Sequence, residues 1–125
     1  MEKEQLKLEN SCIEIIADNM MLDESVFTNV SMQKIKITDA NLSDLHVEGA
    51  QLGGAIFENI GMPPEDHPAY DANLEQRPLM FENSDLSKSR FVNYNLTQVE
   101  LVDCYVKGLI INGISIESLF SKLDQ

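Results

Sequence analysis

The chain has 125 residues, of which 43% are apolar and 6% aromatic, so the composition predicts a single domain, residues 1–125, with an aliphatic core. Its 21 acidic residues against 9 lysines and arginines give a formal charge of −12, which argues against nucleic acid as a ligand because phosphate binding needs basic neutralisation. It has no run of 18 apolar residues and no secretory leader, so we expect no membrane partner and a cytoplasmic location.

The first predicted segment, residues 1–19, has only faint five-residue spacing, at Cys12 and Ala17. Two structures are consistent with it. One is an N-terminal cap or degenerate first coil, and the other is a short strand beginning at Leu6 and Leu8.

The second segment, residues 20–62, has an apolar residue at every fifth position. These centres are Leu22, Phe27, Met32, Ile37, Leu42, Val47, Leu52 and Phe57. A step of five residues turns a side chain by about 140° on a helix and reverses its face in a strand. Neither a continuous helix nor a continuous strand therefore fits. The spacing predicts short extended triplets joined by corners rich in Asn, Asp, Gly and Ser.

The third segment, residues 63–78, interrupts the spacing, and three of the four prolines lie within residues 63–68. Because proline cannot donate a backbone hydrogen bond, we expect a surface insert here. Loops on a scaffold are favoured binding positions. The candidate protein-binding residues are Glu65, Asp66, His67, Tyr70 and Asp71, a mixed acidic and aromatic set suited to a basic partner. The alternative is an excursion without function.

The fourth segment, residues 79–118, repeats the five-residue spacing in a new phase. Its centres are Phe81, Leu86, Phe91, Leu96, Leu101, Val106, Ile111 and Ile116. The position two residues before a centre should face inward, and it holds large residues at Leu45, Tyr94, Val99, Leu109 and Ile114. These residues predict less regular packing.

The last segment, residues 119–125, is predicted to be a C-terminal cap. The helical spacing of Ile116, Leu119, Phe120 and Leu123 predicts a short helix over residues 117–123. Leu119, Phe120 and Leu123 are expected either to cover the open end of the last coil or to meet their copies in a homodimer, since one self-complementary patch suffices for a twofold contact.

Three five-residue units carry a resemblance to a known family. They are Ala40-Asn41-Leu42-Ser43-Asp44, Ser84-Asp85-Leu86-Ser87-Lys88 and Tyr94-Asn95-Leu96-Thr97-Gln98. The sequence resembles the pentapeptide-repeat proteins over residues 20–62 and 79–118. The resemblance implies an all-β fold, a right-handed four-sided parallel β-helix. With four units per coil, this solenoid would have about four coils, a surface insert and a short C-terminal capping helix.

The function expected from these features is a non-enzymatic protein-binding or scaffolding module whose partner is an unidentified protein. The alternative is an acidic DNA mimic that regulates DNA gyrase, a type II topoisomerase, as the resemblance suggests. Half of the excess negative charge lies outside the repeats. Four coils at about 4.8 Å each would also give a rod of only about 20 Å. Both observations favour the binding module.

Residues with catalytic or metal-binding chemistry are sparse. No Ser-His-Asp arrangement, nucleophile elbow or phosphate-binding loop occurs, so we expect no catalytic residue and no cofactor. His46 is expected to be solvated, and His67 alone offers too few ligands for a metal. Cys12 and Cys104 form no CxxC pair, and Cys104 is expected to be buried and inert. Asn41, Asp85 and Asn95 are expected to cap turns.

Overall fold

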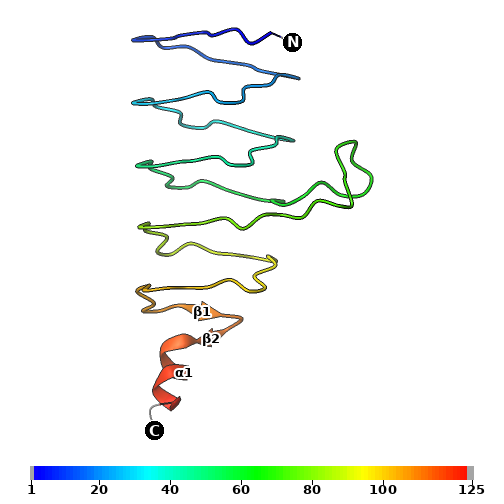
Figure 1. Cartoon of the computed structure of the whole chain (residues 1–125). Helices are drawn as coiled ribbons and strands as arrows, with labels where there is room; N and C mark the ends of the chain where they lie inside the picture. The colour runs from blue at the N-terminus through cyan, green and yellow to red at the C-terminus, as the bar shows by residue number, and fades with distance from the viewer. Residues whose placement is uncertain (1, 124–125) are drawn as a thin grey trace. The chain divides into compact units, whose positions relative to one another are not determined.

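The structure, a computed structural model, describes residues 2–123 (Figure 1). Residue 1 and residues 124–125, which belong to the predicted segments 1–19 and 119–125, lie outside the described residues. The chain divides into two units, Met1–Ile56 and Phe57–Gln125. The regular elements of residues 2–123 all lie in the second unit, in the order β1 (Ile110–Ile111), β2 (Ile114–Ser115) and α1 (Ile116–Leu123).

The backbone of both units turns at the predicted corners. A left-handed residue with positive φ lies two positions after each apolar centre from Leu22 to Phe57 and from Phe81 to Ile111. These residues are Glu24, Asn29, Lys34, Asp39, Asp44, Gly49, Gly54 and Asn59, then Asn83, Lys88, Asn93, Gln98, Asp103, Gly108 and Gly113. The five-residue period is therefore a property of the backbone, and the predicted corners are confirmed.

The corners are of two kinds, tight turns and open bends, and the two kinds alternate from Leu22 to Phe57 and from Phe81 to Val106. In the first kind, except at Met32, the centre accepts a backbone hydrogen bond from the residue three positions later, as in Leu42 with Leu45 (3.1 Å) and Leu96 with Val99 (3.1 Å). Left-handed residues of these turns, apart from glycine, have φ of 61–66° and include Glu24, Asp44 and Lys88. The second kind is an open bend with no such bond in residues 2–123. Except at Gly49, its left-handed residue is Asn or Asp in both units, with φ of 51–59°.

The predicted parallel β-helix is wrong. Within residues 2–123 the sheet consists of β1 and β2 alone, paired antiparallel with Ile110 opposite Ser115 and Ile111 opposite Ile114. Outside α1, the other backbone hydrogen bonds of the described chain join residues three apart, except the bond from Ile116 N–H to Leu109 C=O. Residues distant in sequence seldom approach one another. The extended triplets therefore do not pair into parallel sheets, and neither the all-β class nor the four-coil solenoid is found.

The difference has a physical reason in the range of the interactions. A corner is formed by residues three apart, whereas parallel pairing would join residues a full coil apart and would have to offset the entropy of closing that loop. Large residues such as Leu45, Tyr94 and Leu109 also stand at positions that were expected to face inward, where a closed coil would need small ones. The sequence pattern specifies the local part of the predicted fold but not the non-local part.

The predicted packed core is also absent from the described residues. None of their side chains is buried, and ladder centres such as Leu22 and Phe91 are 52% and 56% exposed. The chain exposes 14029 Å² of accessible surface. A folded monomer of its mass, 14.1 kDa, would expose about 6,700 Å². The apolar ladder therefore faces solvent in both units.

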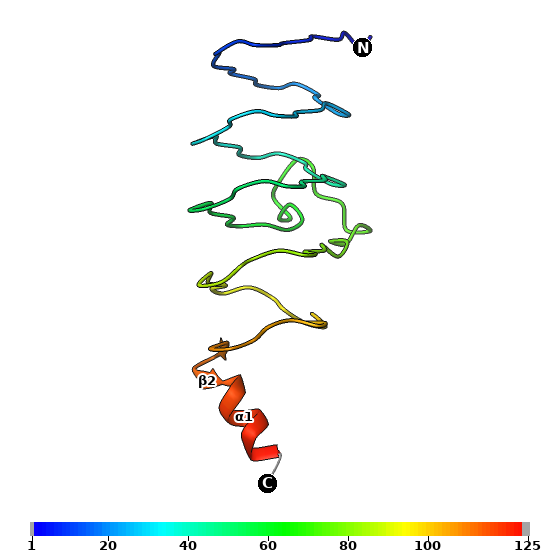
Figure 2. The same ribbon diagram turned by 90° about the vertical axis from the view of Figure 1, so that its left-hand side faces the viewer.

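The C-terminal elements form a hairpin that leads directly into a helix (Figure 2). The hairpin loop is Asn112-Gly113, and both residues have positive φ, as a two-residue loop between right-twisted strands requires. Ser115 Oγ accepts the N–H of Ser118 (3.3 Å) and caps α1. The helix expected over residues 117–123 is confirmed and begins one residue earlier, at Ile116.

Candidate protein-binding surfaces

The insert is built from consecutive tight turns. Pro64 C=O accepts the N–H of His67 (2.9 Å), His67 C=O accepts the N–H of Tyr70 (3.0 Å), and Asp71 C=O accepts the N–H of Leu74 (3.1 Å). Each bond spans three residues, so the segment is ordered by its own backbone. The expected excursion from the five-residue spacing is visible as the loop of residues 63–78 in Figure 1.

Two side chains of the insert add further bonds to these turns. Nδ1 of His67 accepts the N–H of Ala69 (3.0 Å), and Oδ1 of Asp71 accepts the N–H of Asn73 (2.9 Å). Both bonds join a side chain to the backbone two residues later, the pattern of an Asx turn. His67 and Asp71 therefore hold the shape of the loop, a role that the sequence did not predict.

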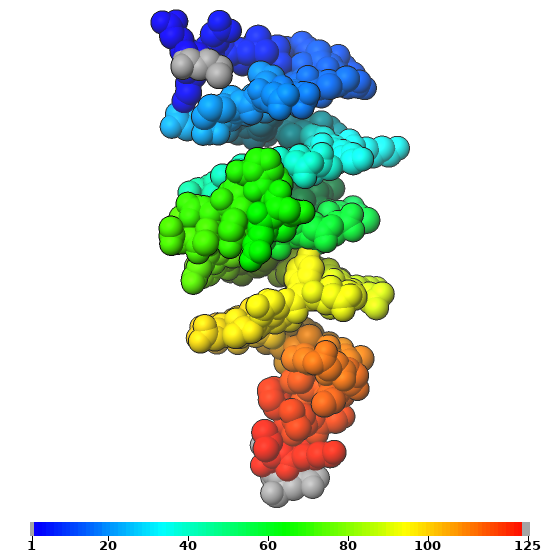
Figure 3. Space-filling view, turned by 90° about the vertical axis from the view of Figure 1, so that its right-hand side faces the viewer, coloured from blue at the N-terminus to red at the C-terminus, as the bar shows by residue number. Residues whose placement is uncertain are grey.

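The five predicted binding residues lie together in this loop and are all exposed. Tyr70 is 41% exposed, so its ring is available to a partner. The insert forms a green lobe on the face shown in Figure 3. Glu65, Asp66 and Asp71 give this lobe a negative charge, and a basic partner would complement it.

The sequence interpretation missed a hollow beside the insert. Residues 57–61, Gln76 and residues 90, 92–95 line it, and its volume is about 670 Å³. The Tyr94 hydroxyl donates a hydrogen bond to Phe57 C=O, and the Tyr94 ring meets Phe91 edge-on, with centroids 5.8 Å apart. Tyr94 thus joins the fourth segment to the chain just before the insert. The signal in the sequence was a tyrosine at a position where the repeat has a small residue.

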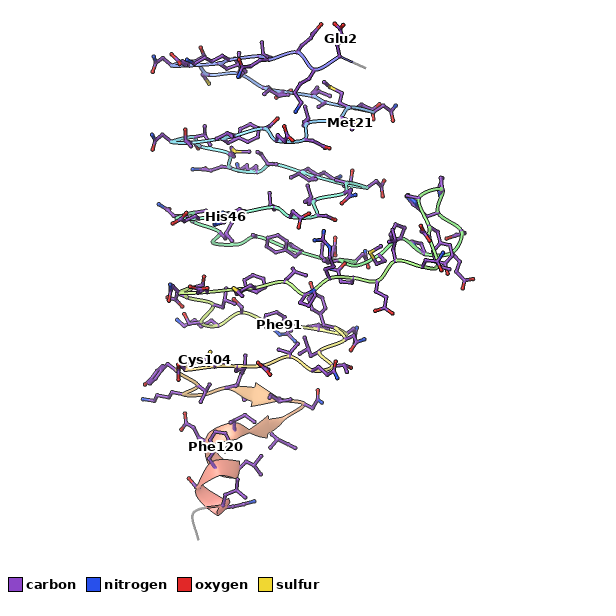
Figure 4. All side chains as sticks on the ribbon, viewed as in Figure 1. Glu2, Met21, His46, Phe91, Cys104 and Phe120 are labelled. Atoms are coloured by element: carbon purple, nitrogen blue, oxygen red, sulfur yellow. The ribbon has the colours of Figure 1, made fainter. Side chains whose placement is uncertain are left out.

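The predicted C-terminal patch lies on α1, where Leu119, Phe120 and Leu123 are 44%, 52% and 74% exposed. The structure brings only Phe120 of these three into a hollow, of about 370 Å³, whose apolar lining includes Leu101, Val106, Leu109, Ile111 and Ile116. Cys104 lines the same hollow, and Figure 4 labels both Cys104 and Phe120. Leu119 and Leu123 remain outside it.

Glu117 links α1 to the last corner. Its Oε1 accepts the N–H of Gly108 at 2.6 Å, and the neighbouring Ile116 N–H donates to Leu109 C=O at 3.1 Å. The carboxylate also lies in the first turn of α1, where negative charge favours the helix. This pair of bonds fixes the start of the helix against the corner at Gly108.

The turn-capping residues behave as predicted. Oδ1 of Asn41, Asp85 and Asn95 accepts the backbone N–H two residues later, at 2.9–3.0 Å. In Asn41 and Asn95 the same oxygen also accepts a hydroxyl, from Ser43 and Thr97 (both 2.6 Å). These polar residues are therefore used in corner formation.

Two exposed carboxyl groups, those of Asp85 and Glu24, have pKa values below their ordinary values. Hydrogen bonds from the Ser87 side chain and then from its backbone hold the pKa of Asp85 below its ordinary value. The pKa of Glu24 is lowered chiefly by a hydrogen bond from Lys3 and secondly by the Lys3 charge, at an Nζ–Oε2 distance of 2.5 Å. Neither group lies in the insert or in the C-terminal patch.

The remaining candidate residues are dispersed. His46 is exposed, as expected, with its Nε2 3.9 Å from Glu48. Cys104 is exposed, so the prediction of a buried thiol is wrong, and its Sγ lies 3.4 Å from Val102 C=O. Across residues 2–123, no three side chains of His, Cys, Asp or Glu are grouped so that they could hold a metal ion.

Two further observations concern membrane-spanning helices and similarity to known proteins. Within the part of the chain that the structure describes, no helix has the length and apolar character needed to cross a membrane. Comparisons with models of protein families, with curated proteins and with solved structures give no match for the chain.

Proposed function

We propose that the chain is a non-enzymatic protein-binding module of the pentapeptide-repeat type that works in the cytoplasm. The observation that carries the proposal is the exposure of the ladder centres in both units, from Leu22 to Leu52 in the first unit and at Phe57 and from Phe81 to Leu101 in the second. Large exposed apolar surfaces mark sites of interaction with other proteins. A partner that covers the ladder would remove from water side chains that the chain itself leaves exposed.

The two parts of the proposed surface have different roles. The ladder is repetitive and apolar, so it provides contact area. The insert provides selectivity, because its acidic side chains and Tyr70 lie on a backbone already ordered by turns. An acidic loop favours a basic partner and disfavours an acidic one.

Affinity capture from the native cells, followed by mass spectrometry, tests this function. Four baits are compared: the intact chain, a chain with residues 64–76 replaced by a Gly/Ser linker of equal length, Leu52→Gln at a ladder centre, and Gln51→Asn beside it as the control. We expect the linker chain and Leu52→Gln to lose the partners that the intact chain and Gln51→Asn retain. Equal recovery by all four baits would contradict the proposed surface.

A supercoiling assay with DNA gyrase separates this function from the DNA-mimic alternative. The net charge of −12 is divided between the repeats and the other segments, whereas a DNA mimic needs its negative charge along the repeats. We expect no inhibition at micromolar protein. Strong inhibition would favour the alternative over the binding module.

A further inference from the structure

His67 lies at the centre of the hydrogen bonding of the insert. Its backbone N–H donates to Pro64 C=O, its C=O accepts from Tyr70 N–H, and its Nδ1 accepts from Ala69 N–H. The next residue, Pro68, has no N–H to donate. The side-chain bond to Ala69 therefore lies inside the turn from His67 to Tyr70 and supplements the backbone bond that closes this turn.

This arrangement requires one protonation state of the imidazole. A ring nitrogen that accepts an N–H carries no proton, so the proton of the neutral ring is on Nε2. A second proton would go to Nδ1 and would place two donors, Nδ1–H and Ala69 N–H, against each other. Imidazole is the side chain whose ordinary titration falls between about pH 5 and 8.

We propose that His67 is a pH-dependent latch of the insert, closed when the imidazole is neutral and opened by its protonation. The charged and titratable groups of the same segment are Glu65, Asp66, Tyr70, Asp71, Glu75 and Arg77. Ordinary carboxylates, tyrosine and arginine keep one charge state through that pH range. The imidazole is therefore the group of the loop whose hydrogen bonding changes.

The consequence for binding rests on the proposed function. An open latch leaves the turn that presents Tyr70 with its backbone bond alone, which makes the turn less rigid, and it adds positive charge to a loop proposed to bind a basic partner. Both effects act in the same direction, so mild acid weakens binding through the insert.

Nuclear magnetic resonance on the 15N-labelled full chain tests the latch without any partner. Between pH 8 and pH 5 we expect the amide signal of Ala69 to move with the same midpoint as the imidazole nitrogens of His67. The exchange rate of the Ala69 amide, corrected for the intrinsic effect of pH, should rise about fivefold, as loss of one hydrogen bond implies. The amide of Asn73, which is bonded to Asp71, is the internal control and should not follow that midpoint.

Two variants distinguish titration from a merely structural role. His67→Asn keeps an acceptor that can reach the N–H two residues later, as Asn41 and Asn95 do in this chain, but it cannot be protonated in this range. It should protect Ala69 at both pH values, and His67→Ala should protect it at neither. The latch would be overturned if the Ala69 amide signal of the intact chain did not change with pH. It would also be overturned if the amide signals of Ala69 and Asn73 changed with the same midpoint.

The same three chains then serve as baits at pH 7.5 and pH 5.5. Capture by the intact chain should fall at the lower pH, and capture by His67→Asn should not. Because the magnetic resonance experiment needs no partner, failure of the latch and failure of the proposed function give different results. A titrating latch with pH-independent capture would overturn the consequence for binding.

Discussion

The substitutions Gly54→Ala and Gly53→Ala, made separately, test whether the corner of the repeat depends on the left-handed backbone of its second residue. The two glycines are adjacent in the turn from Leu52 to Ala55, whose backbone bond is 2.9 Å long. A Cβ at either position would meet nothing within 4 Å, so packing cannot distinguish the two substitutions. Gly54 has φ of +80°, whereas Gly53 lies outside the left-handed region.

The expected magnitudes follow from this difference in φ. Gly→Ala reduces the entropy of the unfolded chain and stabilises a compatible position by about 0.4–1 kcal/mol, whereas a left-handed alanine costs about 1–2 kcal/mol. Gly54→Ala should therefore destabilise the turn by about 1 kcal/mol, and Gly53→Ala should stabilise it by about 0.5 kcal/mol. The difference, about 1.5 kcal/mol, corresponds to roughly a tenfold change in an opening equilibrium.

Hydrogen exchange of the Ala55 amide, followed by magnetic resonance, measures that equilibrium. We expect faster exchange in Gly54→Ala than in the intact chain and slower exchange in Gly53→Ala. Exchange rates that change in the same direction and by the same factor in both variants would refute the assignment of the corner to Gly54.

Three further predictions concern other contacts. The pKa of Asp85 is lowered in the folded chain, so the Asp85 carboxylate should stabilise the turn at any pH above its ordinary pKa of 3.8. This stabilisation should be lost as the pH falls through the lower pKa of the folded chain. The chemical shift of the Ser87 amide should report the loss, and Asp85→Asn should abolish the pH dependence. Glu117→Ala should speed hydrogen exchange of the Gly108 amide by about fivefold, as loss of one hydrogen bond implies, and Glu117→Gln, which keeps the acceptor oxygen, should change it less. If the α1 patch forms a homodimer, light scattering should find a dimer for the intact chain and a monomer for a chain ending at Ser118; a dimer in both would exclude this interface.

The features predicted successfully from the sequence are those that depend on near neighbours. The corners could be predicted because each is determined by the centre and the two or three residues after it, as at Leu42 to Leu45. The turn caps at Asn41 and Asn95 and the helix near Leu119 are equally local. Parallel pairing could not be read from the same pattern, because a five-residue period is compatible with triplets that pair and with triplets that do not.

Two local features were missed for separate reasons. The Asn112-Gly113 hairpin has a recognisable loop signal, but the regular apolar spacing through Ile111 and Ile116 made this region resemble one more repeat unit. In the insert, Pro68 removes a backbone donor and the side chain of His67 becomes an acceptor. Composition indicated a loop with an exposed histidine, but the particular bond depends on the path of the backbone.

The alternation of hydrogen-bonded turns and open bends makes the structural period ten residues, although the hydrophobic period is five. Loss or duplication of one five-residue unit would place two corners of the same kind next to each other. Loss or duplication of ten residues would preserve both the order of corner types and the placement of Asn and Asp at the bends. Homologous chains of different lengths should therefore differ within their repeats by multiples of ten residues more often than by odd multiples of five.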